Sequence, residues 1–436
     1  MAGNGSAGEP RIERLIGAVN IGSFRISAMI AGVTEDGELT VLGSGHRAAQ
    51  GIKRGYVTEM APATYAVRDA IERAEKLAAT SLSGVWIGCS GAGLTSVINP
   101  VEIDVGGRRI EEEDIEHLLE AAREGLEPDG RSVLHAQPAY YFLDGADGVA
   151  NPRGLHADRL GVNVHVMLAD GAPMRNLAEV VQNAHLGVEG IVASPLAAAK
   201  ACLSEEERDL GVALIEFGGQ VTNVSVHAGG MLTGLTSIPR GSADITDAIA
   251  SALGIRPSQA ERLKCVAGSA IASPTDNREM VAVARSDEEG EGPPAHGADE
   301  NNRIPRAELI SIITAELDLL MGDVARALEG MGFAVRSKLS RARQVVLTGG
   351  GAELPGLADY TQGLLGTPVR IGRPPPLRGL PEAHAVPGFT TLAGLVLYAA
   401  EDPVDIRTLG SGYTLAHRPS GLGVARRVWT AMREYF

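Results

Sequence analysis

The sequence has very little cysteine. Only three cysteines occur among 436 residues, and Cys89, Cys202 and Cys265 are scattered, with no CxxC pair and no histidine nearby at ligand spacing. A disulfide framework and a zinc site both need such spacing, so neither is predicted. The expected state of all three thiols is buried and reduced.

Long hydrophobic runs and excess positive charge are also missing. No run reaches the roughly 18 apolar residues that a membrane-spanning helix needs, and the first ten residues, MAGNGSAGEP, lack the apolar core of a signal peptide. The formal net charge of −15 disfavours a nucleic-acid partner, because phosphate binding needs a basic surface. A chain that stays in the cytoplasm is therefore expected.

The composition is that of a folded globular protein. Hydrophobic residues make up 44% and charged residues 21% of the sequence, and the 55 glycines predict many tight turns. Because domains cluster at about 100 to 200 residues, a chain of 436 residues predicts two large lobes or several subdomains.

One supersecondary plan occurs twice along the chain. RLIGAVNIG, FRISAMIAGV and GELTVLGSGH, which begin at Arg14, predict three strands joined by short turns, and a helical stripe follows at about 60 to 80. The segments GVALIEFGG and NVSVHAGGMLTGLTSIP, from Gly211 onward, repeat the strand, turn and strand design. An internal duplication of a nucleotide-binding half is the natural interpretation.

Three other segments interrupt or end this plan. Residues 85 to about 168 form a candidate inserted subdomain, with a strand, an acidic helix start and further strands. Residues 272–306 are acidic and broken by Pro and Gly, which predicts a disordered or mobile loop. The polar, turn-rich stretch from Pro403 predicts a linker.

Glycine turns follow three apolar strands. They are Asn20-Ile21-Gly22-Ser23, Glu216-Phe217-Gly218-Gly219 and Thr348-Gly349-Gly350-Gly351. Glycine lets the backbone approach phosphate oxygens and present its N–H groups. A lone turn of this kind is usually only a turn, but three of them, two opening repeated hairpins, favour one nucleotide held between two lobes.

The last sixteen residues, GLGVARRVWTAMREYF, predict a basic amphipathic helix. At 100° per residue, its apolar face holds Leu422, Ala425, Val428, Trp429, Met432, Tyr435 and Phe436, whereas Arg426, Arg427 and Arg433 lie beside or opposite that face. From Arg418 onward, four Arg and one Glu give a net charge of +3 on a chain of −15. The alternative is a helix docked on its own core, but the polar linker and the charge reversal favour the surface of an anionic membrane.

Further motifs occur in a fixed order and carry a family resemblance. They are GIKRGYV at 51–57, SLSGVWIGCSG at 81–91, PRGL followed by VNVHV within 152–166, SEEERDLGVALIEFGG at 204–219 and VVLTGGGAELPGL at 345–357. Through them the chain resembles the actin, Hsp70 and sugar-kinase superfamily and, within it, the FtsA family of bacterial cell division proteins. The resemblance runs from about Arg14 to Ala400 and returns at the C-terminus.

The resemblance implies an α/β fold of the actin-like (ribonuclease H-like) class, with two lobes, duplicated nucleotide-binding halves and an inserted α+β subdomain. The implied parts are an N-terminal tail (1–12), lobe I (13–83 and 170–208, closed by a helix at 386–402), the inserted subdomain (84–169), lobe II (209–385), the linker (403–420) and the amphipathic helix (421–436). Within lobe II, an adenosine-side subdomain at about 243–340 would carry the acidic loop.

ATP and Mg²⁺ are the cofactors that the resemblance implies. The phosphate loops would be Asn20, Gly22 and Ser23, together with Glu216, Gly218, Gly219 and Gln220. Gly349, Gly350 and Gly351 would form the adenosine loop, and Glu261 and Lys264 would contact the ribose and adenine. Without the family, an i, i+3 Glu and Lys pair is more often a solvated helix face.

The chain departs from the superfamily at its acidic positions. Asn20 stands where Asp is usual, Glu216 is one methylene longer than the usual Asp, and Asn223 replaces another Asp. Because Mg²⁺ favours carboxylates or their bound waters at fixed geometry, only a weak, water-mediated metal contact at Glu216 is expected. Hydrolysis should suffer more than nucleotide binding, so at most a slow ATPase is predicted, with no catalytic residue assigned.

The implied partners are the C-terminal peptide of FtsZ, further copies of the chain in a head-to-tail filament, an anionic membrane surface and other division proteins. The implied location is the cytoplasmic side of the inner membrane at the division site. The peptide would be captured by the subdomain that includes 241–340, although Ala315-Glu316 stands where relatives show Pro-Arg. Two alternatives are an FtsA-like pilus-assembly adaptor and a small-molecule kinase of the same superfamily.

Overall fold

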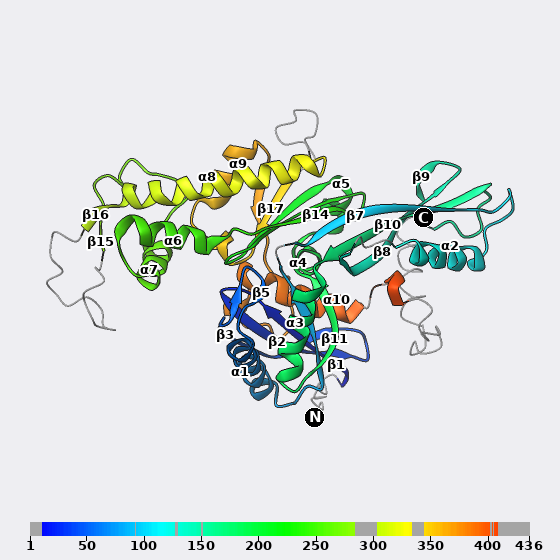
Figure 1. Ribbon diagram of the computed structural model, residues 1–436, viewed down its shortest axis with the longest axis horizontal. Coiled ribbons are helices and arrows are strands. Elements are labelled where there is room, and N and C mark those ends of the chain that lie inside the picture. The colour runs from blue at the N-terminus through cyan, green and yellow to red at the C-terminus, as the bar shows by residue number, and fades with distance from the viewer. Residues whose placement is uncertain are drawn as a thin grey trace, which may run out of the picture.

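The computed structural model describes residues 11–91, 93–126, 130–149, 151–283, 303–333, 344–401, 403 and 405–408. Two lobes are stacked one above the other, and a helical arm and a strand-rich arm extend to opposite sides (Figure 1). The predicted amphipathic helix at 421–436, with all of its candidate membrane residues, lies outside the described residues, as does most of the predicted linker.

Lobe I is built on a five-stranded sheet in the order β11-β6-β1-β2-β3. Three antiparallel strands come first in the chain; β6 then pairs with β1, and β11 with β6, both in parallel. The bounds are β1 (Ile12–Ile21), β2 (Arg25–Thr34), β3 (Leu39–Ala48), β6 (Gly84–Cys89) and β11 (Gly187–Ala193), with the short strands β4 (Ile52–Lys53) and β5 (Tyr56–Val57) beside them.

Helices cover both faces of this sheet, so alternate residues of β1 enter different cores. Val19 and Ile21 pack with α1 (Met60–Ala78) and α3 (Gly171–Asn183), whereas Ile16 and Ala18 pack with α10 (Thr390–Glu401). Helix α10 also crosses α4 (Ser194–Cys202) very closely, because a Cβ on Gly394 would lie 1.8 Å from the Ala197 carbonyl oxygen. Helix α10 thereby closes the lobe formed by the N-terminal strands.

Lobe II repeats this architecture. Its strands run in the order β18-β17-β12-β13-β14, again with three antiparallel strands followed in the chain by two parallel ones. The bounds are β12 (Val212–Phe217), β13 (Thr222–Ala228), β14 (Met231–Ile238), β17 (Gln344–Thr348), β18 (Val369–Ile371), α5 (Glu205–Leu210), α6 (Ser242–Leu253), α7 (Pro257–Ala267), α8 (Arg306–Gly330) and α9 (Leu357–Leu365). The matching strand orders confirm the predicted two-lobed, duplicated α/β fold.

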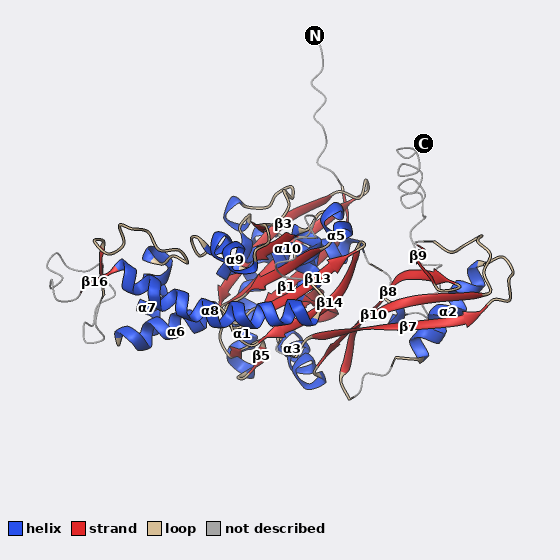
Figure 2. Cartoon of the chain, turned by 90° about the horizontal axis from the view of Figure 1, so that it is seen from above, coloured by secondary structure: helices blue, strands red, loops and turns tan. Residues whose placement is uncertain are grey.

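The strand-rich arm comes from the segment that follows β6. It comprises β7 (Thr95–Asp104), α2 (Glu112–Glu124), β8 (Ser132–Leu143), β9 (Ala146–Val149) and β10 (Arg159–Ala169). Its strands continue the sheet of lobe II through a single pairing, Thr236 with Thr95 (Figure 2). Leu118 and Ala122 on α2 share a separate core with β10, so this arm folds around its own apolar residues.

The opposite arm contains α6, α7 and part of α8. At its end, β15 (Met280–Ala282) pairs with β16 (Arg303–Pro305), so the two ends of the predicted mobile loop 272–306 meet in a small sheet. Residues 284–302 of that loop lie outside the described part of the chain. No helix among the described residues is long and apolar enough to cross a membrane.

Candidate nucleotide site at the junction of the lobes

The first two glycine turns have the same hydrogen bond and touch each other. The Gly22 N–H donates to the Arg25 carbonyl oxygen at 3.2 Å, and the Gly218 N–H donates to the Val221 carbonyl oxygen at 3.0 Å. Gly219 lies against the other turn, because a Cβ on it would come within 2.9 Å of the Phe24 Cβ. Two turns almost 200 residues apart therefore form one continuous backbone surface.

The turn between β4 and β5 joins these hairpins. The Arg54 N–H donates to Oε1 of Gln220 at 2.8 Å, and the next N–H, that of Gly55, donates to Oγ of Ser23 at 3.1 Å. The Arg54 side chain reaches lobe II as well, with Nη2 at 3.2 Å from Oδ1 of Asp244. One short turn of lobe I thus holds a candidate residue from each phosphate loop.

Helix α6 begins directly against the second phosphate loop. The Ser242 and Ala243 N–H groups donate to the carbonyl oxygens of Gly218 and Gly219 at 3.0 and 2.7 Å. A Cβ on Gly241 would lie 2.7 Å from both of these oxygens, which explains the glycine at this position. The first free N–H groups of the helix are satisfied by the loop, so the helix start is bonded directly to the loop.

Glu261 and Lys264 face α6 in this structure. Lys264 is 6% exposed, and its Nζ lies 2.9 Å from the Ser242 carbonyl oxygen, 2.7 Å from Thr246 Oγ1 and 2.8 Å from Glu261 Oε2. Burial raises the pKa of Glu261, but hydrogen bonds from Lys264 and Thr246 outweigh it and leave the pKa below its ordinary value. The pair therefore connects α7 to the start of α6. Ser242, which accepts the Lys264 hydrogen bond, itself donates to Gly218 of the second phosphate loop.

The third glycine turn packs on Phe217, the last residue of β12, where the second phosphate loop begins. Gly349 has a φ of +84°, and a Cβ there would lie 2.6 Å from the Phe217 carbonyl oxygen. On Gly351 a Cβ would lie 2.6 Å from the Phe217 ring, whereas on Gly350 it would meet no atom within 4 Å. Gly349 and Gly351 thus fit a close approach to β12, and Gly350 leaves open space beside the turn.

Glu216 is buried, and each of its carboxylate oxygens accepts a hydrogen bond. Asn223 Nδ2 donates to its Oε2 at 2.7 Å, and the Thr391 hydroxyl donates to its Oε1. Burial raises the pKa of Glu216, and these two hydrogen bonds oppose that effect. Both carboxylate oxygens are thus engaged, which does not fit a direct Mg²⁺ ligand.

Asn20 lies in lobe I, facing β6. Its Oδ1 is 3.1 Å from the position that a Cβ on Gly88 would take. No group of three His, Cys, Asp or Glu residues that could hold a metal ion occurs among the described residues.

Arg25 on β2 contacts the segment before α10, beside the third glycine turn. Its Nη2 donates to the Gly388 carbonyl oxygen at 3.0 Å, and its guanidinium lies 4.0 Å from the centre of the Phe389 ring. Burial lowers the pKa of Arg25, while the nearby Glu353 carboxylate raises it. Glu353 ends the short helix η2 (Gly350–Glu353), so Arg25 connects the first hairpin with the third glycine turn.

The twelve candidate nucleotide residues thus lie in or beside one junction, although Glu261 and Lys264 bond to α6. Sequence reasoning missed the residues that join the parts, namely Arg54, Asp244, Ser242 and Thr391. The motif GIKRGYV carries the family resemblance, but no local pattern marks its bridging role, because Arg54 and its partner Gln220 are separated by 166 positions.

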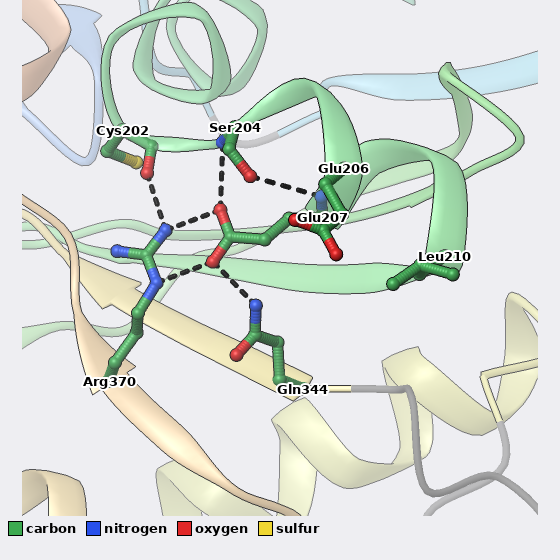
Figure 3. Close-up of a pocket in the computed structure, with 7 residues that line it drawn as sticks. All are labelled: Cys202, Ser204, Glu206, Glu207, Leu210, Gln344 and Arg370. Atoms are coloured by element: carbon green, nitrogen blue, oxygen red, sulfur yellow. Dashed lines mark hydrogen bonds and ion pairs between the residues drawn. The ribbon is translucent and has the colours of Figure 1, made fainter.

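A cavity of about 500 Å³ lies away from this junction (Figure 3). It is next to Gln344, the first residue of β17, at the opposite end of that strand from Gly349. Its Glu207 carboxylate is paired with Arg370 at 2.6 Å and accepts a hydrogen bond from Gln344 at 2.5 Å. These groups satisfy one another, and the cavity contains none of the candidate residues, so it is not assigned to nucleotide.

Family comparisons identify two matching regions. The model described as "Cell division protein FtsA" matches residues 213–394, and the model described as "SHS2 domain inserted in FTSA" matches residues 91–168. A cell division protein FtsA of Rhizobium meliloti (strain 1021) is 32% identical, with 94% of each chain covered. The FtsA of Escherichia coli (strain K12) is 29% identical over 89% of this chain and 91% of its own.

Solved structures share the fold at lower identity. A structure of the PilM-PilN type IV pilus biogenesis complex has a TM-score of 0.60 and 17% identity, covering 90% of this chain and 99% of that one. MreB5 of Spiroplasma citri bound to AMPPNP has a TM-score of 0.52 and 12% identity, covering 89% and 97%. At these identities the likeness concerns the fold alone, and that fold is actin-like.

Proposed function

Because the chain belongs to the FtsA family of cell division proteins, we propose that it binds ATP between its lobes, polymerises and tethers FtsZ to the cytoplasmic membrane. The tether would be the amphipathic segment 421–436, acting on the cytoplasmic side of the inner membrane at the division site. The partners would be the C-terminal peptide of FtsZ, further copies of the chain, anionic lipid and other division proteins.

The observation that carries the ATP proposal is the contact between the two hairpin turns. Gly219 packs on Phe24, and both turns are fixed by backbone N–H groups of one short segment. Backbone N–H groups bind phosphate without needing charged side chains. The open side of Gly350 supports a position for the nucleoside beside the third turn.

Mg²⁺ would bind the nucleotide with few direct ligands from the chain. The Glu216 carboxylate is held by Thr391 and Asn223, and Asn20 carries no charge. Glu216 would therefore contact the ion only through a water molecule, which supports nucleotide binding with slow hydrolysis.

Membrane attachment would depend on many copies acting together. One tail offers a few apolar side chains, each worth about 1.5–3 kcal/mol when fully buried, and each Arg near anionic lipid adds about 1 kcal/mol. Ordering the helix offsets part of this gain, so a single tail binds reversibly. A filament aligns many tails, and avidity then makes attachment lasting.

Vesicle co-sedimentation tests the proposal. The full chain and a chain lacking 421–436 are spun with anionic or with neutral vesicles, each with and without ATP. The full chain should sediment with anionic vesicles, most strongly with ATP, and the shortened chain should stay in the supernatant. A triple Arg426→Gln, Arg427→Gln, Arg433→Gln variant controls for charge at constant length.

Two outcomes would count against the proposal. If the full chain at high concentration with ATP does not sediment with anionic vesicles, the tethering proposal is wrong. If the shortened chain binds them equally well, attachment resides elsewhere in the protein. Adding the FtsZ peptide, and separately a labelled ATP analogue, measures the other two bindings in the same samples.

A further inference from the structure

A second cavity, of about 220 Å³, lies where the inserted arm meets both lobes. Strands β8 and β10 of the arm, β14 and α5 of lobe II, and α4 and α10 of lobe I all contribute to its wall. These elements come together in the centre of the molecule (Figure 1). The cavity is separate from the nucleotide site and contains none of the glycine turns.

An unsatisfied imidazole faces this cavity. His165 on β10 is only 3% exposed, and neither of its ring nitrogens has a hydrogen-bond partner among the described residues. His227 on β13 also lines the cavity and is 2% exposed, with Nε2 only weakly placed at 3.4 Å from Ser225 Oγ. Buried polar groups without partners are costly, so the unpartnered His165 ring calls for an occupant of the cavity.

The fixed charges at the cavity favour an anion. Lys200 is paired with Glu401 at 2.5 Å, which leaves Arg208 as the surplus charge, since it forms no ion pair among the described residues. Burial lowers the pKa of His165 to about 4 and that of His227 to about 3, so both rings are neutral and each offers one N–H donor. A cation would meet the Arg208 guanidinium and is disfavoured.

The remaining wall is largely apolar. It is formed by small and aliphatic side chains from all three parts of the molecule, namely Pro138, Ala139, Leu196, Ala199, Met231 and Leu232. An inorganic anion would leave this surface uncovered, whereas a ligand with a hydrocarbon body would cover it.

We propose that this cavity binds a small organic carboxylate. The carboxylate would accept hydrogen bonds from Arg208 and from an N–H of His165, and the apolar body would pack against Leu196 and Met231. Because the ligand would touch the inserted arm and both lobes at once, it would hold the arm in place against them.

The experiment uses the full chain without nucleotide. Isothermal titration measures binding of benzoate, cyclohexanecarboxylate and 3-methylbutanoate, with benzamide and inorganic phosphate as comparisons. At least one carboxylate should bind saturably at one site per chain, and benzamide and phosphate should bind at least about tenfold more weakly, because a charge-assisted hydrogen bond or the apolar contact is lost.

Variants place the binding in the cavity. Arg208→Gln and His165→Leu should each weaken carboxylate binding about tenfold or more, whereas Arg326→Gln, at an exposed position on α8, should leave it unchanged. His165→Leu should also raise the melting temperature of the ligand-free protein, because an unpartnered buried group is removed. Arg208 is only partly buried, so its variant remains informative if His165→Leu misfolds.

The proposal is overturned if none of the three carboxylates saturates, if phosphate or benzamide binds as tightly as they do, or if Arg208→Gln binds them like the unaltered chain.

Discussion

The clearest contrast at the scale of single residues is between two neighbouring glycines of the third turn. In Gly349→Ala the new Cβ meets the Phe217 carbonyl oxygen in a left-handed backbone, which should cost at least about 2 kcal/mol of unfolding free energy. Gly350→Ala meets no atom, so its effect should be below about 0.5 kcal/mol. Urea denaturation measures both, and equal losses would contradict the packing of this turn on β12.

The buried carboxyl of Glu216 provides a second test. Its pKa is raised in the fold, so it binds protons more readily folded than unfolded, and its charge weakens stability as the pH rises above its ordinary pKa of 4.5. Glu216→Gln keeps the size and the acceptor for Asn223, so unfolding free energy at pH 7 should be unchanged or higher.

Glu216→Leu is the matched comparison, because it leaves Asn223 and Thr391 without their acceptor. It should lose about 1–3 kcal/mol of unfolding free energy. A glutamine variant as unstable as the leucine variant would mean that the negative charge itself stabilises the fold, contrary to the expected cost of burying it.

The contact between helices α6 and α7 depends on one ammonium group. Lys264→Met removes the donor to Ser242 and Thr246 and leaves the Glu261 carboxylate unpaired, which should cost about 2–4 kcal/mol of unfolding free energy. The same change at the exposed Lys53 should be nearly neutral. Because Ser242 also bonds to Gly218, Lys264→Met should weaken binding of a labelled ATP analogue. An unchanged affinity for the analogue would show that the contact between α6 and α7 does not contribute to nucleotide binding.

Strands and helices were predictable where the apolar pattern was strong. The opening meander and its repeat at β12 to β14 carry runs of buried aliphatic residues ending in glycine, and α8 has apolar residues every three or four positions. The burial of Lys264 was not predictable from the sequence, because an i, i+3 Glu and Lys pair has the pattern of a solvated face. Only the fold brings the Ser242 carbonyl oxygen within reach of that amine.

The stability of the whole molecule should fall as the pH drops from 7 to 5. The pKa of His165 is about 4, that of His227 about 3 and that of His384 about 4, all lowered mainly by burial. The unfolded chain therefore binds more protons below about pH 6.5, and each histidine should cost up to about 2 kcal/mol at pH 5. Urea midpoints at the two pH values measure this loss.

His227→Leu is the control for this pH effect. It removes one of the titrating groups, so the loss between pH 7 and pH 5 should shrink while the other histidines still contribute. A midpoint that does not change with pH in the unaltered chain would show that these rings are not held neutral.

For the arrangement of the lobes, the repeat in the sequence predicted two similar halves but not the side-chain contacts between them. Duplicated hairpins predicted two similar halves, and three glycine turns predicted their meeting place, because strand ends carrying glycine gather at one edge of each sheet. Contacts between the halves depend on single side chains far apart in the chain, such as Arg54 with Asp244, and no local pattern marks such pairs. For the same reason the cavity around His165 had no sequence signal.

The turn at Arg54 and Gly55 has a consequence for how the two lobes separate. Two successive backbone N–H groups of this turn donate hydrogen bonds to Gln220 of lobe II and Ser23 of lobe I, and the Arg54 guanidinium bonds to Asp244. Separating the two lobes would break the hydrogen bonds of the turn to Gln220 and Asp244, whereas its bond to Ser23 lies within lobe I and would remain. Separation of the lobes at this point therefore requires both contacts of the Arg54 residue to break, which makes this single turn a brace across the junction.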